Sequence, residues 1–125
     1  MSFVLRGLVP DGGGMYFLPR RVGLARAKEL IFTGRKVDAR EALALGLADR
    51  VTAPASLLGE ARAWATELSR GSPAALAFSK SILDQTFELT RDQVLALSRE
   101  AQAICYTTSE HRDAVEAFLN RPKSR

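Results

Sequence analysis

Three consecutive glycines, Gly12–Gly14, follow Pro10 and Asp11 in this chain of 125 residues. Such a run interrupts helices and strands, because glycine and proline are the strongest breakers of both. The run therefore predicts either a loop that a ligand or another backbone segment can approach closely, or a tight entry into a helix. The spacing matches neither a P-loop nor the glycine pattern of dinucleotide-binding folds.

The first third of the chain is predicted to be irregular, with short helices. A helix from about residue 12 to 18 is interrupted by Pro19, and a second helix at 24–33 is stopped by a glycine. Asp38 and Glu41 form an acidic capping box for a short helix that ends near residue 46. Residues 47–52 are the best candidate for a strand, and a weak one.

From Pro54 onward the pattern is helical. Apolar residues recur every three or four positions in a helix that Gly71 ends. Helix-start signals follow at Ser72-Pro73, for a helix to about Leu89, and at Thr90. A last helix begins near Ser109. The sequence thus predicts a mostly α structure with minimal β.

Composition limits the class of protein. The chain is 46% hydrophobic and 26% charged, as soluble globular proteins are, and contains no apolar run of the ~20 residues that a membrane-spanning helix needs. Its one cysteine, Cys105, cannot form an internal disulfide, so a reducing cytoplasm is the expected location. His111 is the single histidine, which excludes a multi-histidine metal site within one chain, and no metal is expected.

The net charge of +4 comes from the first part of the chain. Residues 1–54 hold nine basic and five acidic side chains, whereas residues 55–125 hold nine of each. This excess fits either an anionic ligand or ordinary solvated helix faces. Nucleic acid is not an expected partner, since aromatic residues are only 7% of the chain and no nucleic-acid-binding motif is present.

Asp11 is the carboxylate most suited to chemistry. Apolar residues precede it, glycine follows it, and no lysine is adjacent. In such surroundings a carboxylate can take a proton from a substrate carbon and return it. The other interpretation is a helix N-cap, in which the carboxylate accepts backbone hydrogen bonds. The two roles are compatible, and the residues alone leave both open.

Three stretches, at residues 7–23, 27–35 and 39–51, resemble the central part of the enoyl-CoA hydratase/isomerase (crotonase) family. Ser79-Lys80, Ala117-Phe118-Leu119 and Lys123 are similar to its C-terminal helices. The resemblance implies the C-terminal portion of the α/β crotonase spiral fold. Residues 1–54 would end the core and carry the catalytic loop, while residues 55–125 would form a helical region for oligomerisation and for covering coenzyme A.

The resemblance also implies roles for particular residues. Asp11 matches the proton-shuttling aspartate of the family's double-bond isomerases, and Phe3 stands where true hydratases have a glutamate. Leu8, Pro10 and Gly12 would lie near the substrate. Phe118 and Lys123 match positions near the adenine and phosphates of coenzyme A.

The implied activity is proton transfer on an acyl-CoA thioester with stabilisation of an enolate, in a trimer or hexamer. Coenzyme A enters as part of the substrate, and no separate cofactor is expected. Family members are about twice as long, so the amides that hold the enolate would lie outside these 125 residues. The chain alone is therefore expected to be inactive. It is also expected to be marginally stable or to self-associate. The alternative is a non-catalytic helical module that assembles and holds coenzyme A.

Overall fold

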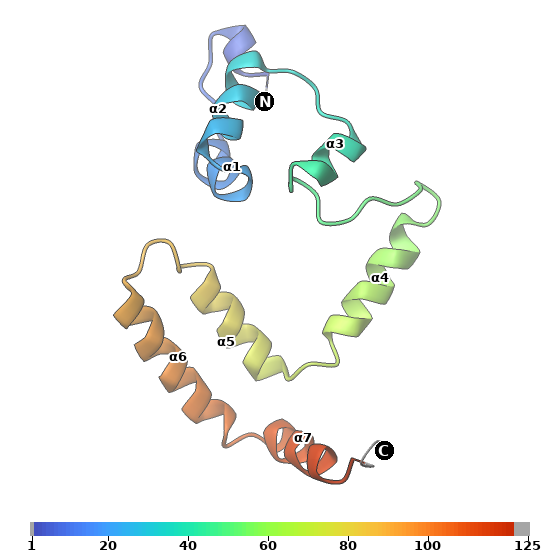
Figure 1. Ribbon diagram of the computed structural model, residues 1–125, viewed down its shortest axis with the longest axis vertical. Coiled ribbons are helices and arrows are strands. Elements are labelled where there is room, and N and C mark those ends of the chain that lie inside the picture. Colours follow the sequence, from blue (N-terminus) through green and yellow to red (C-terminus); the bar gives the residue numbers. More distant parts are fainter. Residues whose placement is uncertain (1, 122–125) are drawn as a thin grey trace. The chain divides into compact units, whose positions relative to one another are not determined.

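The computed structural model describes residues 2–121, and these residues form helices and connecting segments without any β-strand (Figure 1). The elements in chain order are η1 (Val4–Arg6), α1 (Gly14–Val22), α2 (Leu24–Thr33), α3 (Ala39–Ala44), α4 (Leu57–Leu68), α5 (Pro73–Leu83), α6 (Arg91–Cys105) and α7 (Ser109–Leu119). The predicted mostly α character is therefore confirmed.

The chain divides into two compact units, Met1–Leu57 and Leu58–Arg125, which are called unit 1 and unit 2 below. Unit 1 contains η1 to α3, and unit 2 contains nearly all of α4 and the helices that follow. The functional division that the resemblance implies, after residue 54, stays a prediction.

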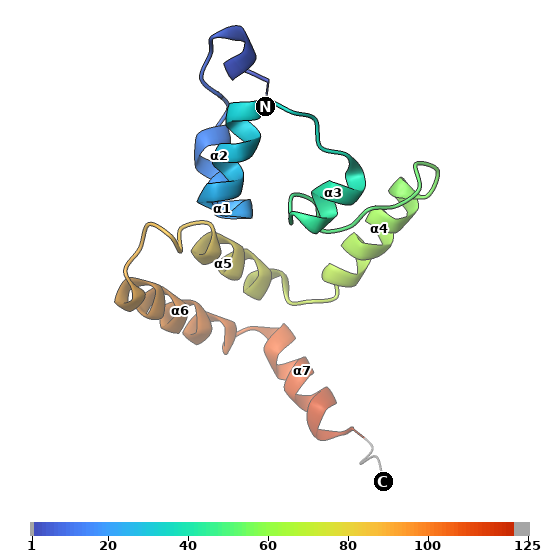
Figure 2. The same ribbon diagram turned by 45° about the horizontal axis from the view of Figure 1, so that its top comes forward.

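Unit 1 has a small hydrophobic core where α1 and α2 pack on each other (Figure 2). Its buried hydrophobic side chains are Leu18, Ala27, Leu30 and Ile31. The last three share one face of α2, as the three- and four-residue spacing requires. Partly buried side chains from the neighbouring segments pack against this core: Val22, Val37, Leu45 and Leu47.

Helix α1 continues past Pro19, where the sequence predicts an interruption. A proline inside a helix removes one backbone donor, and here the rest of the last turn still closes, with Gly23 N–H donating to the Pro19 carbonyl at 2.9 Å. Arg20 also supports this turn, since its guanidinium donates to the Tyr16 carbonyl at 3.1 Å and lies 3.5 Å from the centre of the Tyr16 ring.

The predicted strand at residues 47–52 is wrong. The backbone N–H groups of Leu47 and Ala48 both donate to the carbonyl of Ala42, so the chain turns back onto the end of α3. A strand forms only when another strand completes its hydrogen bonds. The described residues contain no such partner.

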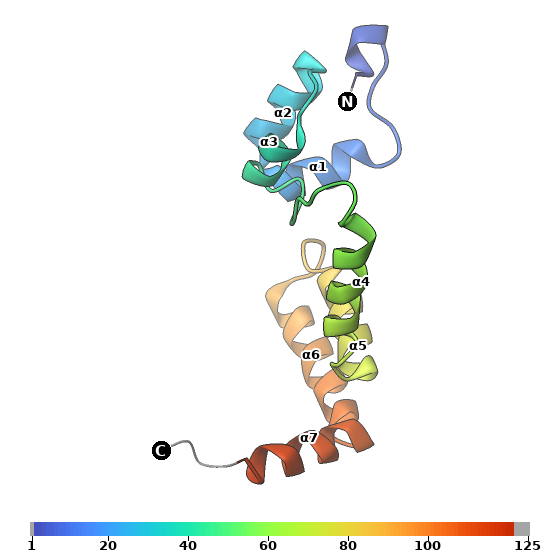
Figure 3. The same ribbon diagram turned by 90° about the vertical axis from the view of Figure 1, so that its right-hand side faces the viewer.

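Unit 2 consists of helices with clear end signals and little packing. Helices α5 and α6 run side by side, joined by the turn at residues 84–90 (Figure 3). Helix α5 ends at Leu83 rather than near Leu89, and α6 begins at the predicted capping box, in which Thr90 and Gln93 exchange both hydrogen bonds. None of the described side chains of unit 2 is fully buried.

Large hydrophobic side chains remain exposed in both units. Exposed fractions are 72% for Val9 and 65% for Phe17 in unit 1, and 68% for Phe118 in unit 2. Single exposed hydrophobic residues are common on protein surfaces, but contiguous exposed sets mark surfaces that bind a partner. Leu5, Leu8 and Val9, which are close in sequence, are all exposed.

Candidate active site

The loop before α1 places Asp11 on the surface of unit 1. Pro10 is buried and anchors the loop, whereas Asp11 and Gly12 are exposed. Gly12 and Gly13 have φ angles of +57° and +81°, in the left-handed region that disfavours residues with a Cβ. The glycine run is therefore a tight helix entry, as one of the two interpretations predicted.

A side chain at position 13 would also meet a neighbour. A Cβ on Gly13 would lie 2.7 Å from the Phe17 ring, one turn further along α1. The Phe17 ring thus lies close to the backbone of the loop, and a Cβ at position 13 would require the ring to move. This contact joins the loop to the first turn of α1, two residues after Asp11.

Asp11 is not a side-chain cap of α1. The N-cap residue is Gly13, without any side-chain hydrogen bond, and Asp11 contributes only its backbone carbonyl, which accepts from Gly14 N–H at 3.0 Å. The capping interpretation of the Asp11 carboxylate is therefore wrong.

The other acidic side chains of unit 1 are all engaged. Asp38 accepts a hydrogen bond from the backbone N–H of Glu41 at 2.8 Å and caps α3. Asp49, Glu29 and Glu41 form ion pairs with arginines. Asp11 is the exception: no group in the part of the chain that the structure describes donates a hydrogen bond to its carboxylate. A carboxylate without an internal partner keeps both oxygens available to a substrate.

Arg35 is the centre of the most extensive polar cluster. Its Nε donates to Glu29 Oε1 at 2.6 Å, while Nη2 and Nη1 donate to the two carboxylate oxygens of Glu41 at 2.6 and 2.9 Å. Glu29 also accepts from Arg26 at 3.0 Å. The hydrogen bond from Arg35, followed by the one from Arg26, lowers the pKa of Glu29. The hydrogen bonds from Arg35 lower the pKa of Glu41 in the same way. The bonds to Glu41 and then Glu29 raise the pKa of Arg35.

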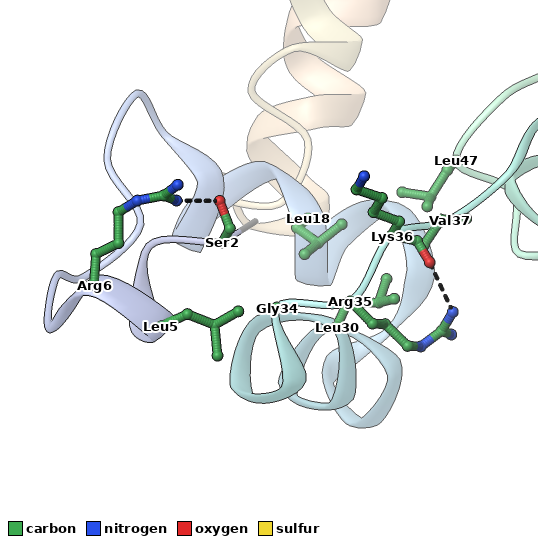
Figure 4. Close-up of a pocket in the computed structure, with 10 residues that line it drawn as sticks. All are labelled: Ser2, Leu5, Arg6, Leu18, Leu30, Gly34, Arg35, Lys36, Val37 and Leu47. Atoms are coloured by element: carbon green, nitrogen blue, oxygen red, sulfur yellow. Dashed lines mark hydrogen bonds between the residues drawn. The ribbon is translucent and has the colours of Figure 1, made fainter.

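This cluster borders a hollow of about 930 Å³ in unit 1 (Figure 4). Leu5, Leu18, Leu30, Val37 and Leu47 give the hollow an apolar floor, and its polar lining residues include Arg6, Arg35 and Lys36. Arg6 is held by a hydrogen bond from its guanidinium to the Ser2 hydroxyl at 2.9 Å. Asp11 is not among the residues that line this hollow.

The sequence did not predict the ion pairs of Arg35 with Glu29 and Glu41, or the hollow beside them. The ion pairs join residues six positions apart across a helix end, a spacing that no local helix rule relates. The capping motif at Asp38 was recognisable, but the bidentate contact of Glu41 with Arg35 depends on the turn between α2 and α3.

The other predicted site residues lie in different places. Leu8 is 58% exposed and, with Pro10 and Gly12, belongs to the same loop as Asp11. Phe118 is an exposed residue of α7 in unit 2. Lys123 lies outside the described residues.

Residues 2–121 offer neither a metal-binding cluster nor a membrane-spanning helix. No group of three or more histidine, cysteine, aspartate or glutamate side chains there could hold a metal ion. No helix in the same range combines the length and the apolar character needed to cross a membrane.

Comparison with known proteins identifies the class. The profile of the family described as enoyl-CoA hydratase/isomerase matches residues 1–125. The short-chain-enoyl-CoA hydratase of Clostridium acetobutylicum is 35% identical over 117 residues, which cover 94% of this chain and 45% of that protein. The probable enoyl-CoA hydratase EchA17 of Mycobacterium tuberculosis is 46% identical over 96 residues, covering 77% of this chain and 37% of that protein.

The solved structures agree. The enoyl-CoA hydratase/isomerase of Cupriavidus metallidurans CH34 superposes with a TM-score of 0.90 and 42% identity, covering 95% of this chain and 45% of that one. The chain belongs to the enoyl-CoA hydratase/isomerase family. Its helices correspond to part of the crotonase fold, and it spans less than half the length of these relatives.

Proposed function

We propose that this chain supplies the proton-transferring carboxylate, Asp11, to an enzyme that moves a double bond in an acyl-CoA thioester. The observation that carries the proposal is the state of Asp11. It is exposed in a loop fixed by Pro10 and the glycines, and among the described residues of unit 1 it is the acidic side chain without an internal partner.

The chemistry needs one carboxylate that acts twice. Asp11 would remove a proton from the carbon α to the thioester carbonyl, leaving a conjugated enolate, and would then return a proton to the γ carbon. The double bond moves by one position and the carboxylate is regenerated. Backbone amides from outside these 125 residues would hold the enolate oxygen, as such donors do in other acyl-transfer and enolisation sites.

Phe3 favours isomerisation over hydration. Addition of water to a conjugated thioester requires groups that activate the water and protonate the carbon, and the resemblance places the second carboxylate of hydratases at position 3. A phenyl ring there can neither donate nor accept a proton. The relatives are named hydratases, and the proposal of isomerisation rests on Asp11 and on the phenyl ring at position 3.

Unit 2 would serve binding and assembly. Phe118, exposed on α7, is proposed to contact the adenine of coenzyme A, with Lys123 near its phosphates as a point charge. The exposed hydrophobic residues of α7 would be covered in a trimer or hexamer. Coenzyme A is the only cofactor-like group required, as part of the substrate, and the cytoplasm remains the proposed location.

The test combines the chain with the part of the fold that it lacks relative to its longer relatives. The chain is co-expressed with the N-terminal part of the Clostridium acetobutylicum relative, and double-bond migration in a 3-enoyl-CoA is followed beside hydration of a 2-enoyl-CoA. Asp11→Asn is expected to reduce migration by about 10²–10⁴-fold while binding of coenzyme A is unchanged. The matched control is Asp49→Asn, another exposed acidic residue of unit 1. Equal turnover for Asp11→Asn and wild type would remove Asp11 from the mechanism.

The alternative function is a non-catalytic module that assembles and holds coenzyme A. What favours it is that the chain spans less than half the length of its relatives, and the resemblance implies that the amides for enolate stabilisation lie in the other part. It predicts that the reconstituted wild-type protein binds coenzyme A and turns over neither thioester. Conversely, the proposed enzyme function predicts no turnover by the 125-residue chain alone, and activity of that chain would contradict the dependence on a second part.

A further inference from the structure

The segment from Arg35 to Asp49, called the α3 segment below, has few ties to the rest of unit 1. A glycine with a left-handed backbone lies at its start, Gly34 with φ +59°, and another lies within it, Gly46 with φ +75°. Helix α3 is only six residues long and has no buried residue. A helix of this length is not stable by itself in water, so its position depends on contacts with its surroundings.

Those contacts are of two kinds. Val37, Leu45 and Leu47 are partly buried against the core of unit 1. The remaining ties are polar: the Arg35 cluster at the start of the segment and the ion pair between Arg21 and Asp49 at its end. The Arg21–Asp49 pair is exposed, since 45% of the Arg21 side chain and 63% of the Asp49 side chain are accessible to solvent. Exposed ion pairs contribute little to stability.

The Arg35 cluster is the stronger polar tie. Arg35 holds Glu41 of α3 through two parallel hydrogen bonds and Glu29 of α2 through a third, so a single guanidinium joins the two helices. Bidentate arginine–carboxylate contacts fix direction as well as distance. About a third of each of these side chains is accessible, less than in the Arg21–Asp49 pair. The other charged groups near this contact are Arg26 and Asp38.

We propose that the α3 segment is a strap that opens and closes as a unit against the core of unit 1, and that Arg35 is the clamp that holds it closed. Arg35, Lys36, Val37 and Leu47 of this segment line the hollow (Figure 4). Opening of the strap would remove one wall of the hollow and expose Leu30 and Leu18, while α1 and α2 stay packed on each other. This proposal is independent of the role of Asp11.

Amide hydrogen exchange of the 125-residue chain tests the strap. Arg35→Met removes all three hydrogen bonds, and Arg40→Met is the matched control, because Arg40 is an exposed arginine of α3. We expect the backbone amides of residues 41–48 to exchange at least tenfold faster in Arg35→Met than in wild type, with the amides of α2 unchanged. Arg40→Met should match wild type.

Arg35→Lys keeps the charge and loses the bidentate geometry, so it should give an intermediate rate. This conservative variant keeps the test decisive if Arg35→Met fails to fold. Equal exchange in the Arg35→Lys and Arg40→Met variants would overturn the clamp. Equal acceleration in α2 and α3 would show that they open together and would overturn the strap.

Discussion

Units 1 and 2 are stabilised at different levels of structure. Among its described residues, unit 1 has four buried hydrophobic side chains, ion pairs that join separate elements, and a partly buried shell around its core. Unit 2 has well-capped helices, with side-chain caps at Ser72, Thr90 and Thr108, but no fully buried side chain among its described residues. Local signals are therefore sufficient to start and end helices, and they do not supply the packing that holds helices together.

The largest expected difference concerns the core. Leu30 is 4% exposed, and Leu30→Ala should reduce the stability of unit 1 by about 2–5 kcal/mol, since it removes apolar contacts and leaves a cavity. Leu58→Ala, at a position 69% exposed in α4, should change stability by less than about 0.5 kcal/mol. Both stability changes can be measured by urea denaturation monitored through amide exchange in α2 and α4. Equal effects would contradict the assignment of a core to unit 1.

Replacing a glycine by alanine should change stability in opposite directions in the two units. Gly13→Ala forces a Cβ into the left-handed region and against the Phe17 ring, and should destabilise unit 1 by about 1–2 kcal/mol. Gly59→Ala, in α4 with open space around it, should stabilise its helix by about 1 kcal/mol. Thermal unfolding by circular dichroism compares them, and a stabilising Gly13→Ala would disprove the described loop geometry.

Loss of a cap should affect unit 2 locally. Thr90→Ala removes the side-chain half of the capping box and should reduce the stability of the first turn of α6 by about 1 kcal/mol. Thr66→Ala, within α4, is the control. Amide exchange at residues 91–95 reports the change, and no difference between the variants would show that packing rather than capping fixes the start of α6.

Acid should loosen unit 1 through a small, specific step. In the folded chain the pKa values of Glu29 and Glu41 lie below their ordinary value of 4.5. The two carboxylates therefore contribute fully to the stability of unit 1 above about pH 4.5, and this contribution is lost as the pH falls through the lowered pKa values. A pH titration of amide exchange in α3 should show this loss, and Glu41→Gln should remove its share. If Glu41→Gln and wild type gave the same pH dependence of exchange in α3, Glu41 would not contribute to the acid sensitivity.

The sequence predicted the parts of the fold that depend on neighbouring residues. The bounds of α2, the cap at Asp38 and the box at Thr90 follow from residues within a few positions and are confirmed. The predicted acidic box is only half formed, because the Glu41 carboxylate binds Arg35 instead of the backbone of Asp38. The predicted strand at 47–52 and the long form of α5 are wrong, because both depend on what lies beside the segment. In the same way, the loop around Asp11 was predictable, whereas the Arg35 cluster depends on tertiary structure.

The contrast between the units is tested most directly by residue-level amide exchange of the 125-residue chain over a dilution series. We expect the amides of α2 around Leu30 to keep their protection on dilution, since their core lies within unit 1. The amides of α7 should exchange faster as the chain is diluted, because none of its side chains is fully buried within the chain and association would cover them. Protection in α7 that equals that of α2 and does not change with concentration would contradict this account.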